Sequence, residues 1–298
     1  MTDLTVYIAH PDYLGALCQE LGDVSSVAGN LVFSTQEKRD ICFASDIWFR
    51  AQIVKFESIS EAVRILRAAG KYWFLNPVES IRRSHLIAEQ LRKLPNLKQS
   101  FPISTPLPQI GCFSLLDKNT LVYAQERWKD PPLGDFQFIE DKENPPNRAY
   151  LKLWEALALY GCYPAQGETA IDLGASPGGW TYVMQSLGVN VTAVDKAPLE
   201  PRIAQLPNVT FLKQSAFALN PANLKTAVDW LLCDVACYPE RSYHLIMAWL
   251  NSGKAKRMIV TIKLQGATNL EVIGRFKAIP GARVIHLLQN KHEVTLLL

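Results

Sequence analysis

The second half of the chain alternates short apolar runs with amphipathic stretches, and this pattern predicts strands that alternate with helices. Seven runs have the length and composition of strands: 168–173, 189–195, 209–212, 230–233, 258–263, 282–288 and 293–298. Apolar residues recur at helical spacing in 149–160, 178–187, 241–251 and 269–278. This alternation predicts an α/β fold, a mostly parallel seven-stranded sheet with helices on both faces. The short connection through Gln289 and Asn290 predicts that the last two strands form an antiparallel hairpin.

Residues 1–130 have a less regular pattern, which predicts a small α+β region. We expect strands at 5–9, 24–35 (a pair), within 41–56 and at 120–124, and helices at 11–21, 58–70 and 80–94. Ser60 is expected near the cap of the second helix, and Pro95 is expected to end the third. Residues 131–147 contain D-P-P-L-G and E-N-P-P-N, which predict a linker. Residues 148–298 then form the second domain.

Composition changes this picture little. A hydrophobic content of 48% and a mean hydropathy of +0.01 are typical of a soluble globular protein. No apolar run approaches the ~20 residues that span a bilayer, and the first ten residues do not resemble a signal peptide. The six cysteines are scattered, which favours reduced thiols in the cytoplasm. Cys233 and Cys237 have no second pair nearby, so we expect no metal site.

The net charge of +3 is too small to indicate a nucleic-acid partner by itself. Basic residues do gather in two segments, 82–98 and 254–257. Each segment is either a solvated helix end or a set of phosphate contacts.

The stretch A-I-D-L-G-A-S-P-G-G-W at 170–180 combines the end of a buried strand, a glycine-rich turn and a helix start. Ser176 suits an N-cap and Pro177 the first helical position. Gly174, Gly178 and Gly179 would allow a ligand to approach the backbone closely, and the carboxylate of Asp172 would reach it.

The glycine spacing G-x-x-x-G-G differs from the G-x-G-x-x-G of dinucleotide oxidoreductases, so a nicotinamide-dependent enzyme is the weaker alternative. A carboxylate beside the turn suits the ammonium group of S-adenosylmethionine (SAM) better than a pyrophosphate. Asp195 ends the next strand, about 20 residues past the first glycine, where a ribose-binding acid is usual.

Ionisable residues follow other strands of the same domain. Asp234 and Lys263 end two apolar strands, and Glu293 begins the last one. Lys152 lies among apolar residues on the preceding helix, where it is either a functional group or a lysine that extends its ammonium to water. If the four converge, Lys263 is a general base when Lys152 and burial dominate, and a charged positioning group when the acids dominate.

Five segments in order, N-R-A-Y-L-K-L-W-E-A, D-L-G-A-S-P-G-G-W-T-Y, W-L-L-C-D-V, V-T-I-K-L and H-E-V-T-L, resemble the FtsJ-like ribose 2′-O-methyltransferases. The resemblance covers 145–298 and is nearest to the M group of that family, which acts on large-subunit ribosomal RNA. That group places a ferredoxin-like and THUMP region before the catalytic domain, and residues 1–130 would be its counterpart.

The resemblance implies a Rossmann-like SAM methyltransferase domain with a Lys–Asp–Lys–Glu catalytic tetrad at Lys152, Asp234, Lys263 and Glu293. It also implies SAM contacts at Gly174, Pro177, Gly178, Trp180 and Asp195, with Asp234 near the transferred methyl group. Ser215 stands where the family usually has an aspartate for the adenine amino group. We therefore expect SAM-dependent 2′-O-methylation of RNA, with ribosomal RNA as the substrate. The alternative is a non-catalytic SAM- and RNA-binding assembly factor.

Overall fold

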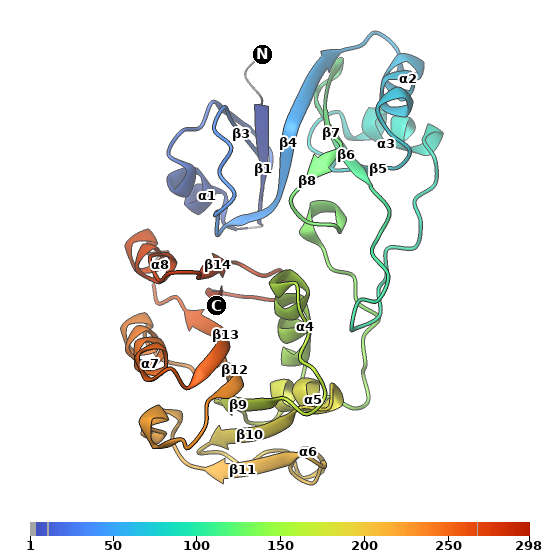
Figure 1. Ribbon diagram of the computed structural model, residues 1–298. Coiled ribbons are helices and arrows are strands. Elements are labelled where there is room, and N and C mark those ends of the chain that lie inside the picture. Colours follow the sequence, from blue (N-terminus) through green and yellow to red (C-terminus); the bar gives the residue numbers. More distant parts are fainter. Residues whose placement is uncertain (1–3, 11, 267) are drawn as a thin grey trace. The chain divides into compact units, whose positions relative to one another are not determined.

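The computed structural model describes residues 4–10, 12–266 and 268–298, and the chain forms two units (Figure 1). One unit ends at Ile139 and the other spans Glu140–Leu298. The break lies within residues 131–147, the stretch expected to be a linker. Among the described residues, none of the helices has the length and apolar content that a membrane span requires.

The second unit is built on a seven-stranded sheet in the order β11-β10-β9-β12-β13-β15-β14. Its strands are β9 (Thr169–Leu173), β10 (Asn190–Asp195), β11 (Val209–Lys213), β12 (Val228–Cys233), β13 (Ala255–Lys263), β14 (Arg283–Ile285) and β15 (Glu293–Leu297). The first five are parallel, and β15 is antiparallel to both of its neighbours, β13 and β14. The predicted fold class is confirmed, including the antiparallel pair at the end of the chain.

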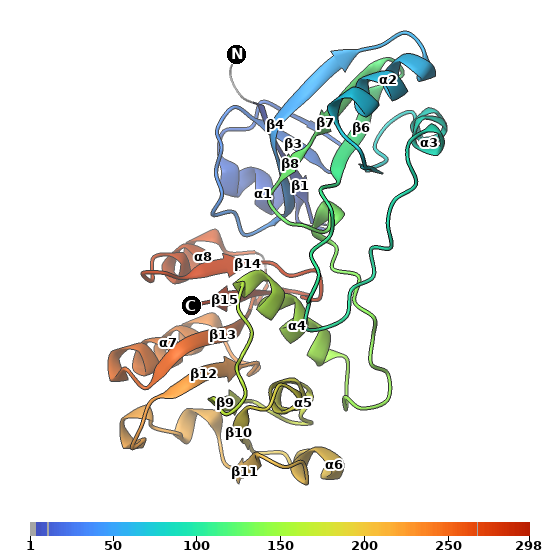
Figure 2. The ribbon, with the colours of Figure 1, turned by 45° about the vertical axis from the view of Figure 1, so that its right-hand side comes forward.

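Helices cover both faces of this sheet (Figures 1 and 2). One face carries α4 (Ala149–Tyr160), α5 (Gly179–Ser186) and the short α6 (Pro201–Ala204); the other carries α7 (Pro239–Ser252) and α8 (Leu270–Lys277). Between β11 and β12 the chain forms only the 3₁₀ turns η2 (Ala216–Ala218) and η3 (Pro221–Asn223). The carboxyl ends of the parallel strands therefore share one edge, with α4 and α7 on opposite faces.

The connection between β14 and β15 differs from the expected tight hairpin. β14 ends at Ile285 and β15 begins at Glu293, so a loop at 286–292 joins them. The tight-hairpin prediction was wrong because the N–H groups of Leu288 and Gln289 donate to the Glu155 carboxylate on α4. These groups are therefore used outside the strand pair.

The first unit contains a sheet in the order β2-β3-β1-β4-β7-β6-β5, with β8 also paired to β4. Its strands are β1 (Leu4–Ala9), β2 (Ser26–Ala28), β3 (Leu31–Ser34), β4 (Ala44–Lys55), β5 (Trp73–Leu75), β6 (Gly111–Asp117), β7 (Thr120–Ala124) and β8 (Glu126–Arg127). Its helices are α1 (Leu14–Leu21), α2 (Ile59–Ala69) and α3 (Ile81–Gln90), and η1 (Pro132–Gly134) follows β8. The long β4 joins two apolar clusters, one around Trp48 and one around Phe113.

Two helix ends in this unit were predicted wrongly. Ser58, and not Ser60, caps α2, because its side chain accepts a hydrogen bond from the N–H of Glu61. The third helix ends at Gln90, before Pro95, and Leu91 is already extended. The likeness of this unit to ferredoxin-like and THUMP regions stays a prediction.

A buried ion pair fixes the chain after β8. Asp46 is fully buried, and its Oδ2 accepts from Arg127 at 2.9 Å. Arg127 also donates to the carbonyls of Ile110, Asp130 and Pro131 at 2.8 to 3.0 Å. Burial raises the pKa of Asp46, and the charge of Arg127 offsets only part of that effect.

We expect Arg127→Met to lower the free energy of unfolding of the first unit by about 3–5 kcal/mol at pH 8, because Asp46 loses its partner for a buried charge. The loss becomes smaller as the pH falls, because burial raises the pKa of Asp46 and a protonated Asp46 needs no partner charge. Urea unfolding with hydrogen exchange at β4 measures it. Arg64→Met is the matched control, since Arg64 is exposed and changes stability by less than about 0.5 kcal/mol. Equal losses in both variants would contradict this account.

Candidate active site

Two lysines and two acids meet at the carboxyl edge of the second unit's sheet. Lys152 lies on α4, Asp234 follows β12, Lys263 ends β13 and Glu293 begins β15. The register of β13 and β15 places Lys263 directly opposite Glu293. Lys263 Nζ lies 2.6 Å from Asp234 Oδ1 and also contacts Glu293 Oε2. Lys152 Nζ lies 3.2 Å from Asp234 Oδ2 and 2.5 Å from Glu293 Oε1.

Exposure divides the four into an inner and an outer pair. The side chains of Lys152 and Glu293 are each 9% exposed, whereas those of Asp234 and Lys263 are 20% and 24% exposed. Only Asp234 and Lys263 are accessible enough to touch a substrate directly. The inner pair, Lys152 and Glu293, holds Asp234 and Lys263 in place through these ion pairs. The two positive and two negative charges neutralise one another, which offsets the free-energy cost of burying them.

The cluster keeps Lys263 charged. Burial by itself lowers the pKa of Lys263, but Asp234 and Glu293 more than reverse this and raise the pKa above its ordinary value. For Asp234, burial raises the pKa, and Lys152 and Lys263 more than reverse it, so the net change is downward. At neutral pH the site therefore holds an ammonium and a carboxylate, which favours the positioning alternative for Lys263 over the general base.

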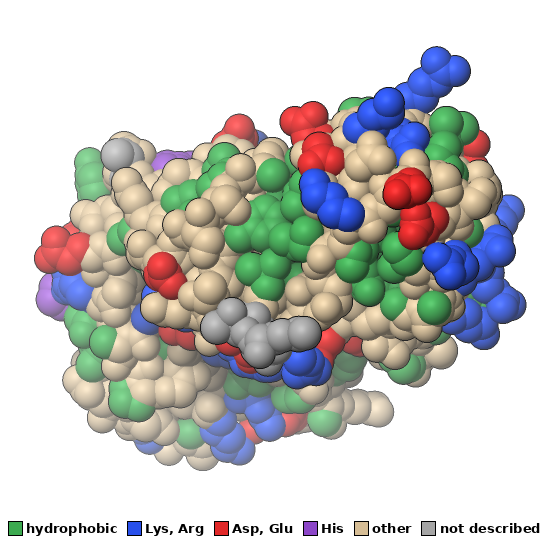
Figure 3. All heavy atoms as spheres, turned by 90° about the horizontal axis from the view of Figure 1, so that it is seen from above, with side chains coloured by type: hydrophobic (Ala, Val, Ile, Leu, Met, Phe, Trp, Pro, Cys, Tyr) green, Lys and Arg blue, Asp and Glu red, His purple; other side chains and the backbone are tan. Residues whose placement is uncertain are grey.

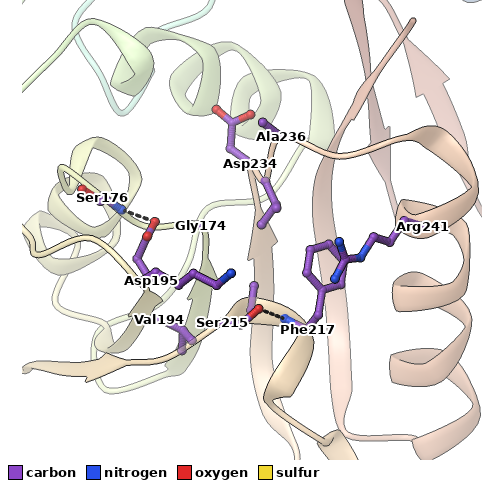
Figure 4. Close-up of a pocket in the computed structure, with 12 residues that line it drawn as sticks. Gly174, Ser176, Val194, Asp195, Ser215, Phe217, Asp234, Ala236 and Arg241 are labelled. Atoms are coloured by element: carbon purple, nitrogen blue, oxygen red, sulfur yellow. Dashed lines mark hydrogen bonds between the residues drawn. The ribbon is translucent and has the colours of Figure 1, made fainter.

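A cavity of about 370 Å³ opens beside this cluster (Figure 4). Five of the residues predicted to bind a cofactor line it: Gly174, Ser176, Asp195, Ser215 and Asp234. Predicted residues that do not line it are Asp172, Pro177, Gly178, Gly179 and Trp180. Because Asp234 belongs to both the cavity and the charged cluster, whatever fills the cavity lies next to the four groups.

The glycine turn is organised differently from the prediction. Ser176 does not cap α5; its hydroxyl donates to the carbonyl of Pro198 at 2.8 Å. The residue that precedes the helix is Gly178, with φ 118°, a backbone conformation that glycine adopts most easily. A Cβ there would lie 2.7 Å from Ile203 Cγ2. The N–H of Ser176 instead donates to Asp195 Oδ2 at 3.0 Å and fixes that carboxylate at the cavity.

Opposite the turn lies an arrangement that the sequence did not suggest. The guanidinium of Arg241, in the first turn of α7, stacks over the ring of Phe217 at 3.7 Å, and both line the cavity (Figure 4). Ser215 lies beside them, and its hydroxyl oxygen accepts from the N–H of Phe217 at 3.3 Å. Phe217 and Arg241 are far apart in the chain, and no spacing rule connects them.

Comparison with known proteins agrees with this geometry. Residues 145–287 match the FtsJ-like methyltransferase family. The match spans most of the second unit, from near its first residue to the loop before β15.

Curated relatives named "Ribosomal RNA large subunit methyltransferase M" are similar to about half of this chain. Three of them illustrate the match. The one from Halorhodospira halophila is 41% identical over 133 residues, 44% of this chain and 38% of its own length. The one from Alkalilimnicola ehrlichii is 33% identical and covers 51% of this chain and 45% of its own length. The one from Laribacter hongkongensis is 35% identical and covers 47% of this chain and 41% of its own length. The matched stretch thus spans less than half of each relative.

Two residues that were predicted to contact the cofactor, Trp180 and Asp172, are buried inside the second unit. Trp180 is buried and donates from Nε1 to the carbonyl of Ala149 at 2.9 Å, which ties α5 to the start of α4. Asp172 is 1% exposed, and its Oδ2 accepts from the Thr181 hydroxyl at 2.7 Å. The expected direct reach of Asp172 to a ligand is not seen, because Thr181 and the packing of α5 enclose it. Burial raises the pKa of Asp172 to about 7.

The raised pKa of Asp172 predicts how the stability of the folded protein changes with pH. Below pH 4 Asp172 is protonated in both the folded and unfolded chain, and above pH 7 it is ionised in both. Between these values only the unfolded chain loses its proton readily, so the contribution of Asp172 to stability falls as pH rises. We expect Asp172→Asn to remove about 4 kcal/mol of this decline, the energy of a shift of about three pKa units. Urea unfolding of both proteins from pH 4 to 8 measures it, and parallel curves would contradict it.

Proposed function

We propose that this protein transfers a methyl group from SAM to the 2′-hydroxyl of a ribose in RNA, with ribosomal RNA as the substrate. The observation that carries the proposal is the Lys263 ammonium, held between Asp234 and Glu293 at the edge of a cavity. The names of the relatives, and the family match, support methyl transfer and a ribosomal RNA substrate.

The cavity residues fit SAM chemically. The carboxylate of Asp195 follows the second strand of the fold, where a ribose diol is usually bound. Asp234 places negative charge next to the position that a sulfonium would take. Ser215, Phe217 and Arg241 supply a hydroxyl, an aromatic face and a guanidinium plane for adenine, in place of the usual carboxylate. The pocket volume lies within the range of small-molecule sites, ~300–1,000 Å³.

SAM held beside Asp195 and Asp234 would supply an electrophilic methyl group to the ribose oxygen, with S-adenosylhomocysteine as the leaving group. Lys263 orients the hydroxyl oxygen of the RNA by donating a hydrogen bond from its ammonium. The hydroxyl proton becomes strongly acidic as the oxygen is alkylated, so Asp234 can accept it despite its lowered pKa. Lys152 and Glu293 keep the outer pair in register throughout.

The first unit offers a surface for the RNA backbone. Lysine and arginine side chains gather on the right of Figure 3, the side on which Figure 1 places α2 and α3. The ring of Tyr72 carries the Lys71 ammonium at 5.1 Å and the Arg92 guanidinium at 5.4 Å. Cations next to a half-buried aromatic ring suit phosphate and base together.

Lys263→Ala is expected to lower the rate of methyl transfer by about 10²–10⁴-fold, because the hydroxyl is no longer oriented beside Asp234, which takes its proton. Binding of S-adenosylhomocysteine by calorimetry and of RNA by filter retention should stay within about twofold, since neither depends mainly on this ammonium. Transfer is measured with labelled SAM and RNA from a strain that lacks the gene, followed by nucleoside mapping.

Lys256→Ala is the matched control, because Lys256 lies on the same strand but pairs with Asp229 away from the cavity. Unchanged biological activity of Lys263→Ala would favour the non-catalytic assembly factor. Label on a base instead of a sugar would overturn the ribose assignment and leave methyl transfer intact.

Arg241→Ala is expected to weaken S-adenosylhomocysteine about tenfold, because a stacked base contact is worth ~1–3 kcal/mol. Arg275→Ala is a close control, since Arg275 also stacks on a ring, that of Tyr243 at 4.5 Å, outside the cavity lining. Calorimetric titration compares the two. Equal affinities would show that adenine does not contact Arg241.

A further inference from the structure

The loop at 286–292 is bound to α4 by a buried carboxylate. Glu155 is 1% exposed; its Oε1 accepts from the N–H of Leu288 at 2.8 Å, and its Oε2 from the N–H of Gln289 at 3.1 Å. Glu155 lies three residues after Lys152, so the two share a helix face. The helix that supplies one lysine of the cluster therefore also holds the loop that leads into Glu293.

Asn290, in this loop, bonds directly to the cluster. It is 6% exposed, and one orientation of its amide satisfies both of its polar atoms. In that orientation Nδ2 donates to Glu293 Oε1 at 3.3 Å, and Oδ1 accepts from the Leu287 N–H and the Thr295 hydroxyl, both at 3.1 Å. A buried amide with hydrogen-bond partners for both its nitrogen and its oxygen has a preferred orientation.

The two oxygens of Glu293 consequently have separate partners. Oε1 receives Asn290 and Lys152, while Oε2 receives Lys263. If Oε1 is held from two sides, the carboxylate cannot turn, and Oε2 stays on Lys263. Among the described residues the Lys263 ammonium has two carboxylate acceptors, and an ammonium has three donors, so one N–H remains for a substrate oxygen.

We infer that Asn290 is a positioning residue that aims Lys263 at the substrate hydroxyl through Glu293, and that Glu155 fixes the loop carrying it. The inference rests on the proposed function for its effect on rate, but not for its effect on the cluster. Loss of the amide would free Glu293 to rotate, and the third N–H of Lys263 would lose its direction.

The test compares Asn290→Ala and Asn290→Asp with Asn251→Ala, an exposed asparagine on α7. Asn290→Ala should lower kcat on the order of 10²-fold, the typical cost of a misaligned reacting group, with KM for RNA and S-adenosylhomocysteine affinity unchanged. Asn290→Asp keeps the shape of the side chain but adds a carboxylate beside Glu293. The added negative charge disfavours ionisation of the carboxyl groups in the cluster, so the acidic limb of the kcat profile should move to higher pH, whereas in Asn290→Ala it should not.

A second measurement does not depend on methyl transfer. Reductive methylation of Lys263 at several pH values, followed by mass spectrometry, reports how firmly its ammonium is held. Asn290→Ala and Glu155→Gln should both speed this labelling, and Asn251→Ala should not. If labelling changes but the wild-type protein methylates no RNA, the proposed function fails and the positioning role stands.

Unchanged labelling of Lys263 together with unchanged kcat in Asn290→Ala would overturn the inference. A fall in kcat that merely follows a loss of folded protein, with the same pH profile in Asn290→Asp as in the wild type, would also overturn it. Thermal unfolding of each variant separates these results.

Discussion

The contact of one lysine with two carboxylates is the interaction on which the site depends. Lys263 ends β13, Asp234 follows the neighbouring parallel strand, and Glu293 begins the antiparallel strand on the other side. Parallel strands bring their carboxyl ends to one edge, and only a reversed strand can bring its first residue to the same edge. The reversed direction of β15 therefore supplies the second acid, Glu293. The second lysine, Lys152, comes from α4, which packs on one face of the sheet.

The charged cluster and the cavity are one electrostatic system because Asp234 belongs to both. A cation in the cavity would draw on the negative charge that now holds Lys263 and would weaken the preference of Lys263 for its proton. The charged state of the free site and that of the loaded site are thus linked through one carboxylate.

Sequence patterns were sufficient for features that depend on local composition. The residues alone left open the convergence of Lys152, Asp234, Lys263 and Glu293, which the family resemblance implied, whereas the strands of the second unit and their parallel arrangement were predictable from its apolar runs. Details that depend on packing were not: Ser176 bonds to a carbonyl instead of capping a helix, and Trp180 and Asp172 point inward. Arg241 stacks on a ring in another loop, and Glu155 has the appearance of an ordinary helical residue. In the first unit, β5 has only three residues, too few to show a period, and β6, although seven residues long, follows a stretch with several prolines. The Asp46–Arg127 pair joins residues that are far apart in the sequence.

The position of β15 within the sheet has a consequence for biosynthesis. It is made after β13 and β14, yet it lies between them in the sheet. Until it is inserted, those two strands have no common neighbour, and the two lysines of the cluster face a single acid. A nascent chain that has not reached residue 293 therefore has every glycine of the glycine turn but no complete charged cluster. The four charges come together only once β15 has been made and inserted.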